Sequence, residues 1–364
     1  MNWLRSELCQ ARHVDALAVA PIYYKIASFS AKQIRLVRNP YFHEWSPAQP
    51  DGYPDDIIER FGYRDDVAAA RAVQHGEADL TGFDNTVPAA VISDLSSQFA
   101  RQLHENPSLA TGFINLNTRV APFNDVRVRR AVNYAVDRNH WVALRSAHFF
   151  QPSCQVLPPG VPGYKRYCPY TIHRTADGKY HGPDPATAQK LVAASGTRGA
   201  RVTVSVTPMG YCAPCLNYFI SVLKRLGYKA GLEVNAALYN RGGDSRARVQ
   251  AIGNVYFADF RLASTFLLPF LSCSSFKPAT TSNPNLSEFC NHHIDRLMAR
   301  AQAAQLTDPQ AAATLWSRAD HDIVDQAPYF VIFNFKDFEF TSARTRNYVF
   351  SSFTGTLVDQ LWVK

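Results

Sequence analysis

The chain has 364 residues, of which 46% are hydrophobic and 12% aromatic, and this apolar content excludes an intrinsically disordered protein. The length predicts two or more lobes, because single hydrophobic cores rarely grow beyond roughly 250–300 residues. The net charge of +8 is spread along the sequence without a basic run that has interleaved aromatics, so we predict a solvated surface and no nucleic-acid partner.

No stretch approaches the ~18–20 apolar residues that a membrane-spanning helix needs, and the longest candidate, 266–271, is far too short. The first residues, Met1–Cys9, carry charges every few positions and no continuous apolar segment. They are therefore predicted not to form a signal peptide. Taken alone, this start predicts a chain that stays in the cytoplasm or is a piece of a longer protein.

In the first part of the chain, alternation of apolar and polar residues predicts strands at 24–29, 33–38, 57–63, 77–81 and 113–117. Helical periodicity predicts helices at 65–76, 88–99 and 126–146. Asp65 and Asp125 directly precede two of them and are predicted to be their N-caps.

Long loops rich in Pro, Gly and Ser are predicted at 152–185 and 273–290. Between and after them, the patterns predict strands at 201–206, 233–239, 255–260 and 329–335, followed by a strand-like tail at 338–362. Helices are predicted at 184–194, 216–226, 293–304 and 309–326. Helices thus alternate with strands, which predicts an α/β fold.

Six of the seven cysteines fall into close pairs, and Cys9 is left over; the candidate disulfide pairs are Cys154 with Cys168, Cys212 with Cys215, and Cys273 with Cys290. A bridge that closes a loop of about fifteen residues stabilises a fold by roughly 3 kcal/mol. Disulfides persist in oxidising compartments and are rare in the cytosol. The cysteines therefore indicate an exported protein, in conflict with the start of the chain.

No catalytic signature for a nucleophilic serine, a zinc protease, a P-loop or a dinucleotide site is present. Cys212-Ala213-Pro214-Cys215 precedes a predicted helix, and it is interpreted either as a redox-active pair or as a small bridge or two free thiols in a turn. The expected fold around it differs from that of a thioredoxin. The segment 290–293, Cys-Asn-His-His, offers metal ligands, with a loop cysteine beside a helix start as the alternative. We predict neither an enzyme nor a resident metal or cofactor.

The order of motifs resembles the extracellular solute-binding proteins, family 5, of peptide and nickel ABC transporters. The resemblance covers roughly residues 20–364. The matching segments are Leu36–Phe42 before Pro50–Asp55, Gly76–Leu80, Asn115–Asn117 followed by Pro122–Arg138, Asp184-Pro185 with the helix after it, and Arg225–Tyr228.

This resemblance implies a two-lobed, class II periplasmic-binding-protein-like fold in which ligand binds between the lobes. Residues 1–112 and 336–364 would belong to the first lobe, and 113–335 would form the second, ligand-binding lobe. In peptide-binding relatives an aspartate after a short aromatic strand holds the α-ammonium group. Residues 256–260 match that motif, which makes Asp259 the candidate anchor and Tyr256, Phe257 and Phe260 its aromatic surroundings. Relatives often have tryptophan at the place of Tyr256.

The resemblance also implies a function: a monomeric component of an ABC import system that captures a peptide or another small solute and delivers it to a membrane permease. The full-length protein would be extracytoplasmic, at the cell surface or in the periplasm. Family members have a signal peptide and a longer first lobe, so an N-terminally truncated chain is expected. The alternative is a ligand-sensing domain, or a binding-impaired form, that is not coupled to transport.

Overall fold

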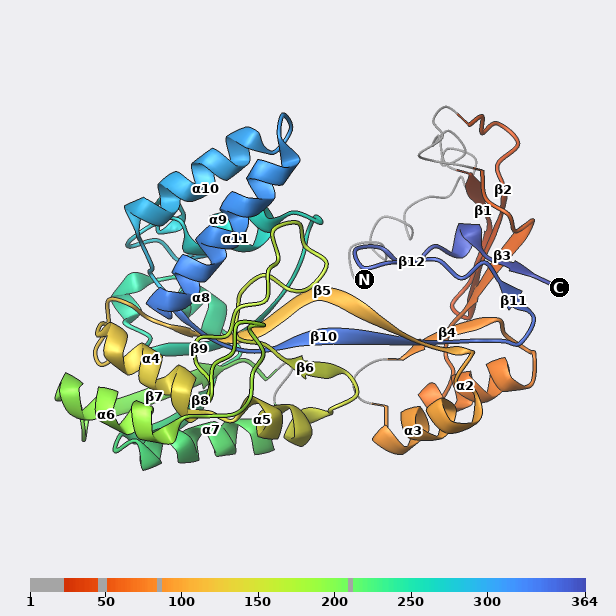
Figure 1. Cartoon of the computed structure of the whole chain (residues 1–364). Coiled ribbons are helices and arrows are strands. Elements are labelled where there is room, and N and C mark those ends of the chain that lie inside the picture. Colours follow the sequence, from red (N-terminus) through yellow and green to blue (C-terminus); the bar gives the residue numbers. More distant parts are fainter. Residues whose placement is uncertain (1–22, 45–50, 84–86, 209–211) are drawn as a thin grey trace. The chain divides into compact units, whose positions relative to one another are not determined.

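The computed structural model describes residues 23–44, 51–83, 87–208 and 212–364 (Figure 1). They divide into two compact units, one formed by the residues up to 106 together with 338–364 and one formed by 107–337. Two long strands, β5 (Leu103–Leu116) and β10 (Tyr329–Thr341), pass from one unit into the other. Met1–Cys9, for which the sequence predicts no signal peptide, lies outside the described residues.

The first unit contains a three-stranded antiparallel sheet made of β1 (Tyr24–Phe29), β2 (Gln33–Arg38) and β3 (Asp56–Arg60). Tyr24 pairs with Arg38 across the first two strands, and Gln33 pairs with Arg60 across the second two. The hydroxyl of Ser30 accepts hydrogen bonds from the backbone N–H groups of Lys32 and Gln33, which closes the turn between β1 and β2. The strands predicted at 24–29 and 33–38 are confirmed, and the one predicted at 57–63 is confirmed in part, because it ends at Arg60.

The described part of this unit also contains the helices α2 (Asp66–Gln74) and α3 (Ala89–Gln98) and the strand β4 (Leu80–Phe83), which pairs with the end of β10. Asp65 is the N-cap of α2, as predicted, because its carboxylate accepts the N–H of Ala68 at 2.8 Å. The C-terminal tail forms two short pairs, β11 (Thr345–Arg346) with β14 (Trp362–Val363) and β12 (Phe350–Ser351) with β13 (Gly355–Thr356).

The second unit is built on a mixed sheet in the order β10-β5-β9-β7-β8, with β6 (Phe150–Pro152) paired to β10. Strand β9 (Ala251–Phe257) runs antiparallel to β5, whereas β7 (Arg201–Val206) is parallel to both β9 and β8 (Lys229–Val234). A parallel pair needs a long crossover, and α7 (Ala213–Arg225) provides it between β7 and β8.

Figure 1 shows helices on both sides of this sheet, with α4–α7 on one side and α9–α11 on the other. Their bounds are α4 (Val126–Ala135), α5 (Arg138–Arg145), α6 (Pro185–Ser195), α9 (Ala263–Leu271), α10 (His292–Ala304) and α11 (Pro309–Gln326). A large core cluster lies among β5, β10 and α9–α11 and includes buried Trp316 and Phe266. This layered arrangement confirms the α/β class.

Several predicted elements are wrong in part. The single helix expected at 126–146 is two helices, because Val136 is extended and Asp137 caps a second helix by accepting the N–H groups of Asn139 and His140. The strand expected at 233–239 ends at Val234. A short helix, α8 (Leu238–Gly242), follows and buries Leu238 in a small apolar cluster.

Strands β5 and β10 are longer than the predicted 113–117 and 329–335, and helix α9 was not predicted at all. The apolar run 266–271 forms most of α9, and Phe266, Leu267 and Leu271 are buried because they pack into the core cluster of the second unit that contains Trp316. A short apolar run has no period that separates a buried helix from a buried strand. Among the described residues, no helix combines the length and apolarity needed to cross a bilayer.

All six paired cysteines are joined in the structure, as Cys154–Cys168, Cys212–Cys215 and Cys273–Cys290. The first bridge joins two positions within the loop at 153–184. The third bridge joins the segment after α9 to the residue that precedes the N-cap of α10. All three lie within the second unit.

Candidate functional site

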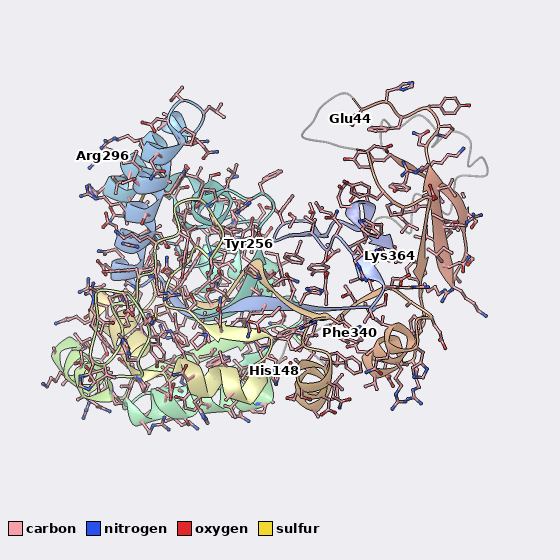
Figure 2. The ribbon with its side chains drawn as sticks, turned by 45° about the vertical axis from the view of Figure 1, so that its right-hand side comes forward. Glu44, His148, Tyr256, Arg296, Phe340 and Lys364 are labelled. Atoms are coloured by element: carbon pink, nitrogen blue, oxygen red, sulfur yellow. A yellow bond between two sulfur atoms is a disulfide. The ribbon has the colours of Figure 1, made fainter. Side chains whose placement is uncertain are left out.

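The residues predicted to bind a ligand, 256–260, lie where β9 ends (Figure 2, where Tyr256 is labelled). The sheet contact continues one residue further, because the N–H of Ala258 donates to the carbonyl of Leu109 on β5 at 2.9 Å. Asp259 follows directly, so its backbone is fixed by the strand pairing while its side chain is exposed.

The Tyr256 side chain holds the Asp259 carboxylate. The Tyr256 hydroxyl donates to Oδ2 of Asp259 at 2.6 Å, and the hydroxyl of Thr265 lies 2.6 Å from the same tyrosine oxygen. Because the tyrosine has one proton and gives it to the carboxylate, the threonine hydroxyl donates to the tyrosine. The three side chains therefore form a short chain of hydrogen bonds that ends on an exposed carboxylate.

Helix α9 keeps the Tyr256 ring in place. Phe266 and Phe270 pack against it edge to face, with ring centroids 5.2 Å and 4.7 Å away. Burial raises the pKa of the Tyr256 hydroxyl, and its hydrogen bond to Asp259 acts in the same direction. The hydroxyl therefore stays protonated at neutral pH and remains a donor to Asp259.

Two exposed phenylalanines lie on either side of Asp259 in the sequence. Phe257 is 57% exposed and Phe260 is 63% exposed, which is unusual for side chains of this size. The Phe257 ring lies 5.1 Å from the ring of Phe335 on β10, and Phe335 in turn contacts Phe150 and Phe333. Two exposed aromatic side chains are thus close to Asp259 in the sequence, and one of them, Phe257, packs at the edge of a buried cluster of rings. Exposed aromatic side chains near a carboxylate are common in binding sites.

Within the part of the chain that the structure describes, no Lys, Arg or His side chain forms an ion pair with Asp259, and its Oδ1 makes no hydrogen bond. One carboxylate oxygen is therefore fixed by Tyr256, while the other faces solvent with its acceptor capacity unused. This arrangement can receive a cationic N–H donor such as an ammonium group.

The four predicted site residues come from one short segment, so their closeness follows from the sequence itself. Sequence reasoning missed Thr265, which supports Tyr256 from the first turn of α9. The only signal was its place just before the apolar run 266–271, and that run was not assigned to a helix.

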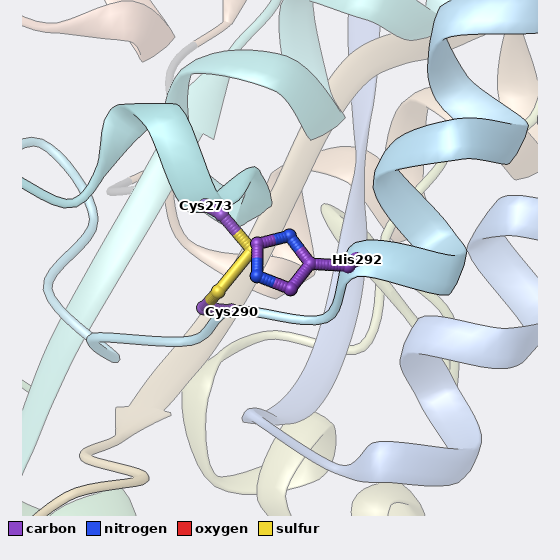
Figure 3. Close-up of side chains that lie close together, drawn as sticks. All are labelled: Cys273, Cys290 and His292. Carbon is purple, nitrogen blue, oxygen red and sulfur yellow. A yellow bond between two sulfur atoms is a disulfide. The ribbon is translucent and has the colours of Figure 1, made fainter.

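The metal-ligand alternative at 290–293 falls on a disulfide. Ligand atoms of Cys273, Cys290 and His292 lie within 4.8 Å of one another (Figure 3). The two sulfur atoms, however, are bonded to each other, and a metal ligand must be a thiolate. His292 itself is exposed and lies 3.8 Å from Asp295 at the start of α10. In its disulfide form this cluster has one imidazole and one carboxylate to offer a metal.

Comparison with solved structures identifies the fold as that of class II periplasmic binding proteins. HbpA2 from Haemophilus parasuis superposes with a TM-score of 0.77 at 19% identity, over 94% of this chain and 64% of that one. The clavulanic acid biosynthesis oligopeptide binding protein 2 gives 0.77 at 21% identity, over 94% and 62%. DppA from Helicobacter pylori, solved with the peptide STSA, gives 0.65 at 20% identity, over 94% and 62%.

The sequence comparison then shows the family. Residues 23–278 match the family model for bacterial extracellular solute-binding proteins, family 5 Middle. The chain belongs to this family, whose members are binding proteins and not enzymes.

Among curated relatives, heme-binding protein A of Haemophilus influenzae is 27% identical over 289 residues, which is 77% of this chain and 49% of that protein. The periplasmic oligopeptide-binding protein OppA of Escherichia coli is 25% identical over 265 residues, 71% of this chain and 45% of that one. The glutathione-binding protein GsiB of Shigella dysenteriae is 24% identical over 292 residues, 78% and 53%. The chain spans about half the length of these relatives.

Proposed function

We propose that this chain is the solute-binding component of an ABC import system and that it binds peptides through their α-ammonium group. The observation that supports the proposal is the exposed Asp259 carboxylate, fixed on one oxygen by Tyr256 and unpaired with any described cation. An ammonium group that donates to such a carboxylate makes a charge-assisted hydrogen bond, roughly twice as strong as a neutral one.

The exposed rings of Phe257 and Phe260 would receive the apolar part of the ligand. A peptide presents an ammonium group and side chains a few ångströms apart, and the carboxylate and the rings are neighbours in the same segment. The carboxylate would select for the charge, and the aromatic surface would add affinity in proportion to the apolar area it covers.

The names of the relatives give three ligand classes: haem, oligopeptides and glutathione. Peptides and glutathione carry an ammonium group, whereas haem carries two propionate carboxylates and no cationic N–H donor on its periphery. A second carboxylate beside Asp259 would be repelled. We therefore favour a peptide-like ligand over haem.

The first experiment measures binding by isothermal titration calorimetry on the whole chain, with trialanine, N-acetyl-trialanine, glutathione and haem as probes. Trialanine is expected to bind, and acetylation is expected to weaken it by about 10- to 100-fold because the neutral amide cannot form the charge-assisted bond. Equal affinity for the acetylated peptide, or binding of haem alone, would contradict the ammonium proposal.

Variants assign the effect to the site. Asp259→Asn should lower the affinity for trialanine about as much as acetylation does, and the two changes combined should cost little more than either one. Tyr256→Phe, which keeps the ring but frees the carboxylate, should weaken binding by less, on the order of a few-fold. The matched control is Asp94→Asn, which removes an exposed carboxylate from α3 and should leave the affinity unchanged.

We further propose that the protein works outside the cytoplasm and delivers its ligand to a membrane permease. The family description as extracellular and the three disulfides support this location. Uptake of labelled trialanine by cells with and without the gene tests the coupling. Uptake that depends on the gene supports transport, whereas unchanged uptake together with intact binding supports a sensing role.

A further inference from the structure

The Cys212–Cys215 disulfide has a place in the fold that the ligand-binding proposal does not use. It closes the first turn of α7, a helix of 13 residues, within the segment Cys212-Ala213-Pro214-Cys215. We propose that this segment is a redox-active centre that undergoes thiol–disulfide exchange with a dithiol partner. Position, accessibility and hydrogen bonding each support the assignment.

The two cysteines differ in accessibility. Cys212 is half-buried, and Cys215 is fully buried with no exposed surface. An incoming thiolate must approach along the axis of the disulfide bond and can therefore reach only the sulfur of Cys212. The structure thus defines which sulfur is attacked and which one leaves.

The N-terminus of α7 favours the negatively charged thiolate form of Cys212. Cys212 is the N-cap of α7, and its sulfur accepts the backbone N–H of Cys215 at 3.4 Å. A thiolate accepts such a bond far better than a thiol does, and it also gains from the partial positive charge at a helix N-terminus. Cys212 is therefore suited to be the stable thiolate of the reduced pair.

The surroundings of Cys215 favour the protonated thiol over the thiolate. Its sulfur lies 3.9 Å from the backbone carbonyl oxygen of buried Trp141 on α5. Once reduced, Cys215 can donate its S–H to this carbonyl, which holds the proton on the buried sulfur. The reduced centre would therefore hold one thiolate at the surface and one thiol inside.

The exchange balances in two steps. A thiolate of the dithiol partner attacks Cys212, the Cys212–Cys215 bond breaks, and the Cys215 sulfur leaves with the bonding electron pair and takes up a proton. The partner's second thiol, after losing its proton, attacks the partner sulfur of the mixed disulfide and releases Cys212 as a thiolate. The partner loses two electrons and becomes a disulfide, and the Cys212–Cys215 bridge gains these two electrons and becomes a dithiol.

The Cys154–Cys168 bridge provides an internal reference. Cys154 and Cys168 are both buried, at 5% and 3% exposure, and their bridge closes a loop of sequence separation 14. Neither cysteine stands at the start of a helix, since 153–184 contains no helix. We therefore expect Cys154–Cys168 to resist reduction in the folded chain, whereas Cys212–Cys215 exchanges.

The test uses the oxidised whole chain, equilibrated in glutathione buffers of increasing reducing strength and then in dithiothreitol. Each cysteine is read by differential alkylation and peptide mass spectrometry, and folding is followed by circular dichroism. We expect Cys212 and Cys215 to become reduced while the chain is folded and Cys154–Cys168 is intact. The proposal is overturned if Cys212–Cys215 stays oxidised until the chain unfolds, or if it is reduced together with Cys154–Cys168.

Two single variants test the assigned roles. In Cys215→Ser, Cys212 should form a stable mixed disulfide with glutathione; in Cys212→Ser, the buried Cys215 should react with iodoacetamide at least about tenfold more slowly than Cys212 does in the first variant. Similar rates for the two cysteines would contradict the roles. If Cys215→Ser does not fold, the redox titration of the unmodified chain still decides the proposal.

Discussion

Arg138 shows how a single charged residue is accommodated inside the second unit. It is fully buried, and its guanidinium donates to the carbonyls of Ser153, Val331 and Asn133 and to the side-chain oxygen of Asn133, at 2.8–3.0 Å. Phe330 lies 4.9 Å from its charged carbon. Burial lowers the pKa of Arg138, and these acceptors replace the water that the cation has lost.

Asp320 on α11 is the corresponding buried acid. Its two carboxylate oxygens accept the N–H groups of Val156, Leu157 and the Gln155 side chain at 2.8–3.4 Å. Burial raises the pKa of Asp320 to about 7, although these three donors oppose the shift. The carboxylate fixes the start of the loop that Cys154–Cys168 closes.

This raised pKa predicts a pH dependence. The folded chain holds a proton on Asp320 up to about pH 7, whereas the unfolded chain releases it near pH 3.9. The contribution of this protonation to the free energy of unfolding is therefore fully present below about pH 4 and is lost as the pH rises through 7. Urea unfolding measures the free energy of unfolding of the native chain and of Asp320→Asn at each pH. The difference between the two, native chain minus variant, should fall by an amount on the order of a few kcal/mol between pH 4 and 8.

The control for this experiment is Asp94→Asn, whose exposed carboxylate should give a difference that is flat over the same range. A flat difference for Asp320→Asn as well would show that the three N–H donors outweigh burial and keep the carboxylate ionised. That result would contradict the prediction.

At the scale of elements, the contact between β5 and β10 depends on the absence of a side chain at Gly112. A Cβ atom at this position would lie 2.4 Å from ring atoms of Phe333. Phe333 is itself held between the rings of Phe150 and Phe335, at 4.6 Å and 5.4 Å. The ring therefore has little room to move aside.

We predict that Gly112→Ala lowers the free energy of unfolding by about 1–3 kcal/mol, because the core must shift to admit one methyl group. Thermal unfolding measures the effect. The matched control is Gly231→Ala on β8, where a Cβ would meet no atom within 4 Å, and it should be neutral or slightly stabilising. Equal Tm values for the two variants would show that the Phe333 ring yields without cost.

Most helix starts could be predicted from sequence, because a cap acts on backbone groups within three residues of itself. Asp65, Asp125 and Asp184 each accept an N–H from the first turn of the helix that they were predicted to begin. The helix break at Val136 and the short helix after Val234 were missed. At both places the hydrophobic pattern continues without a break. The structure nevertheless changes, because Asp137 caps a new helix and because burial of Leu238 stabilises a short helix after the strand.

At the scale of the whole molecule, the second unit is continuous in sequence and contains all three disulfides and the Asp259 site. We predict that a fragment of residues 107–337 folds independently. It should show one cooperative thermal transition and, in non-reducing mass spectrometry, six cysteines without free thiols. Absence of a cooperative transition would mean that this unit needs residues outside 107–337 to be stable.

The sequence by itself determined the α/β class, most helix caps, the three cysteine pairs and, through its resemblance to a family, the segment 256–260. These features depend on residues that are close together in the chain. Only the tertiary structure decided that Thr265 supports Tyr256, that Asp320 and Arg138 are buried with partners from distant segments, and that Gly112 faces Phe333. Some of those contacts join residues more than two hundred positions apart in the sequence. Their energies depend on burial, and burial is defined only once the segments have packed.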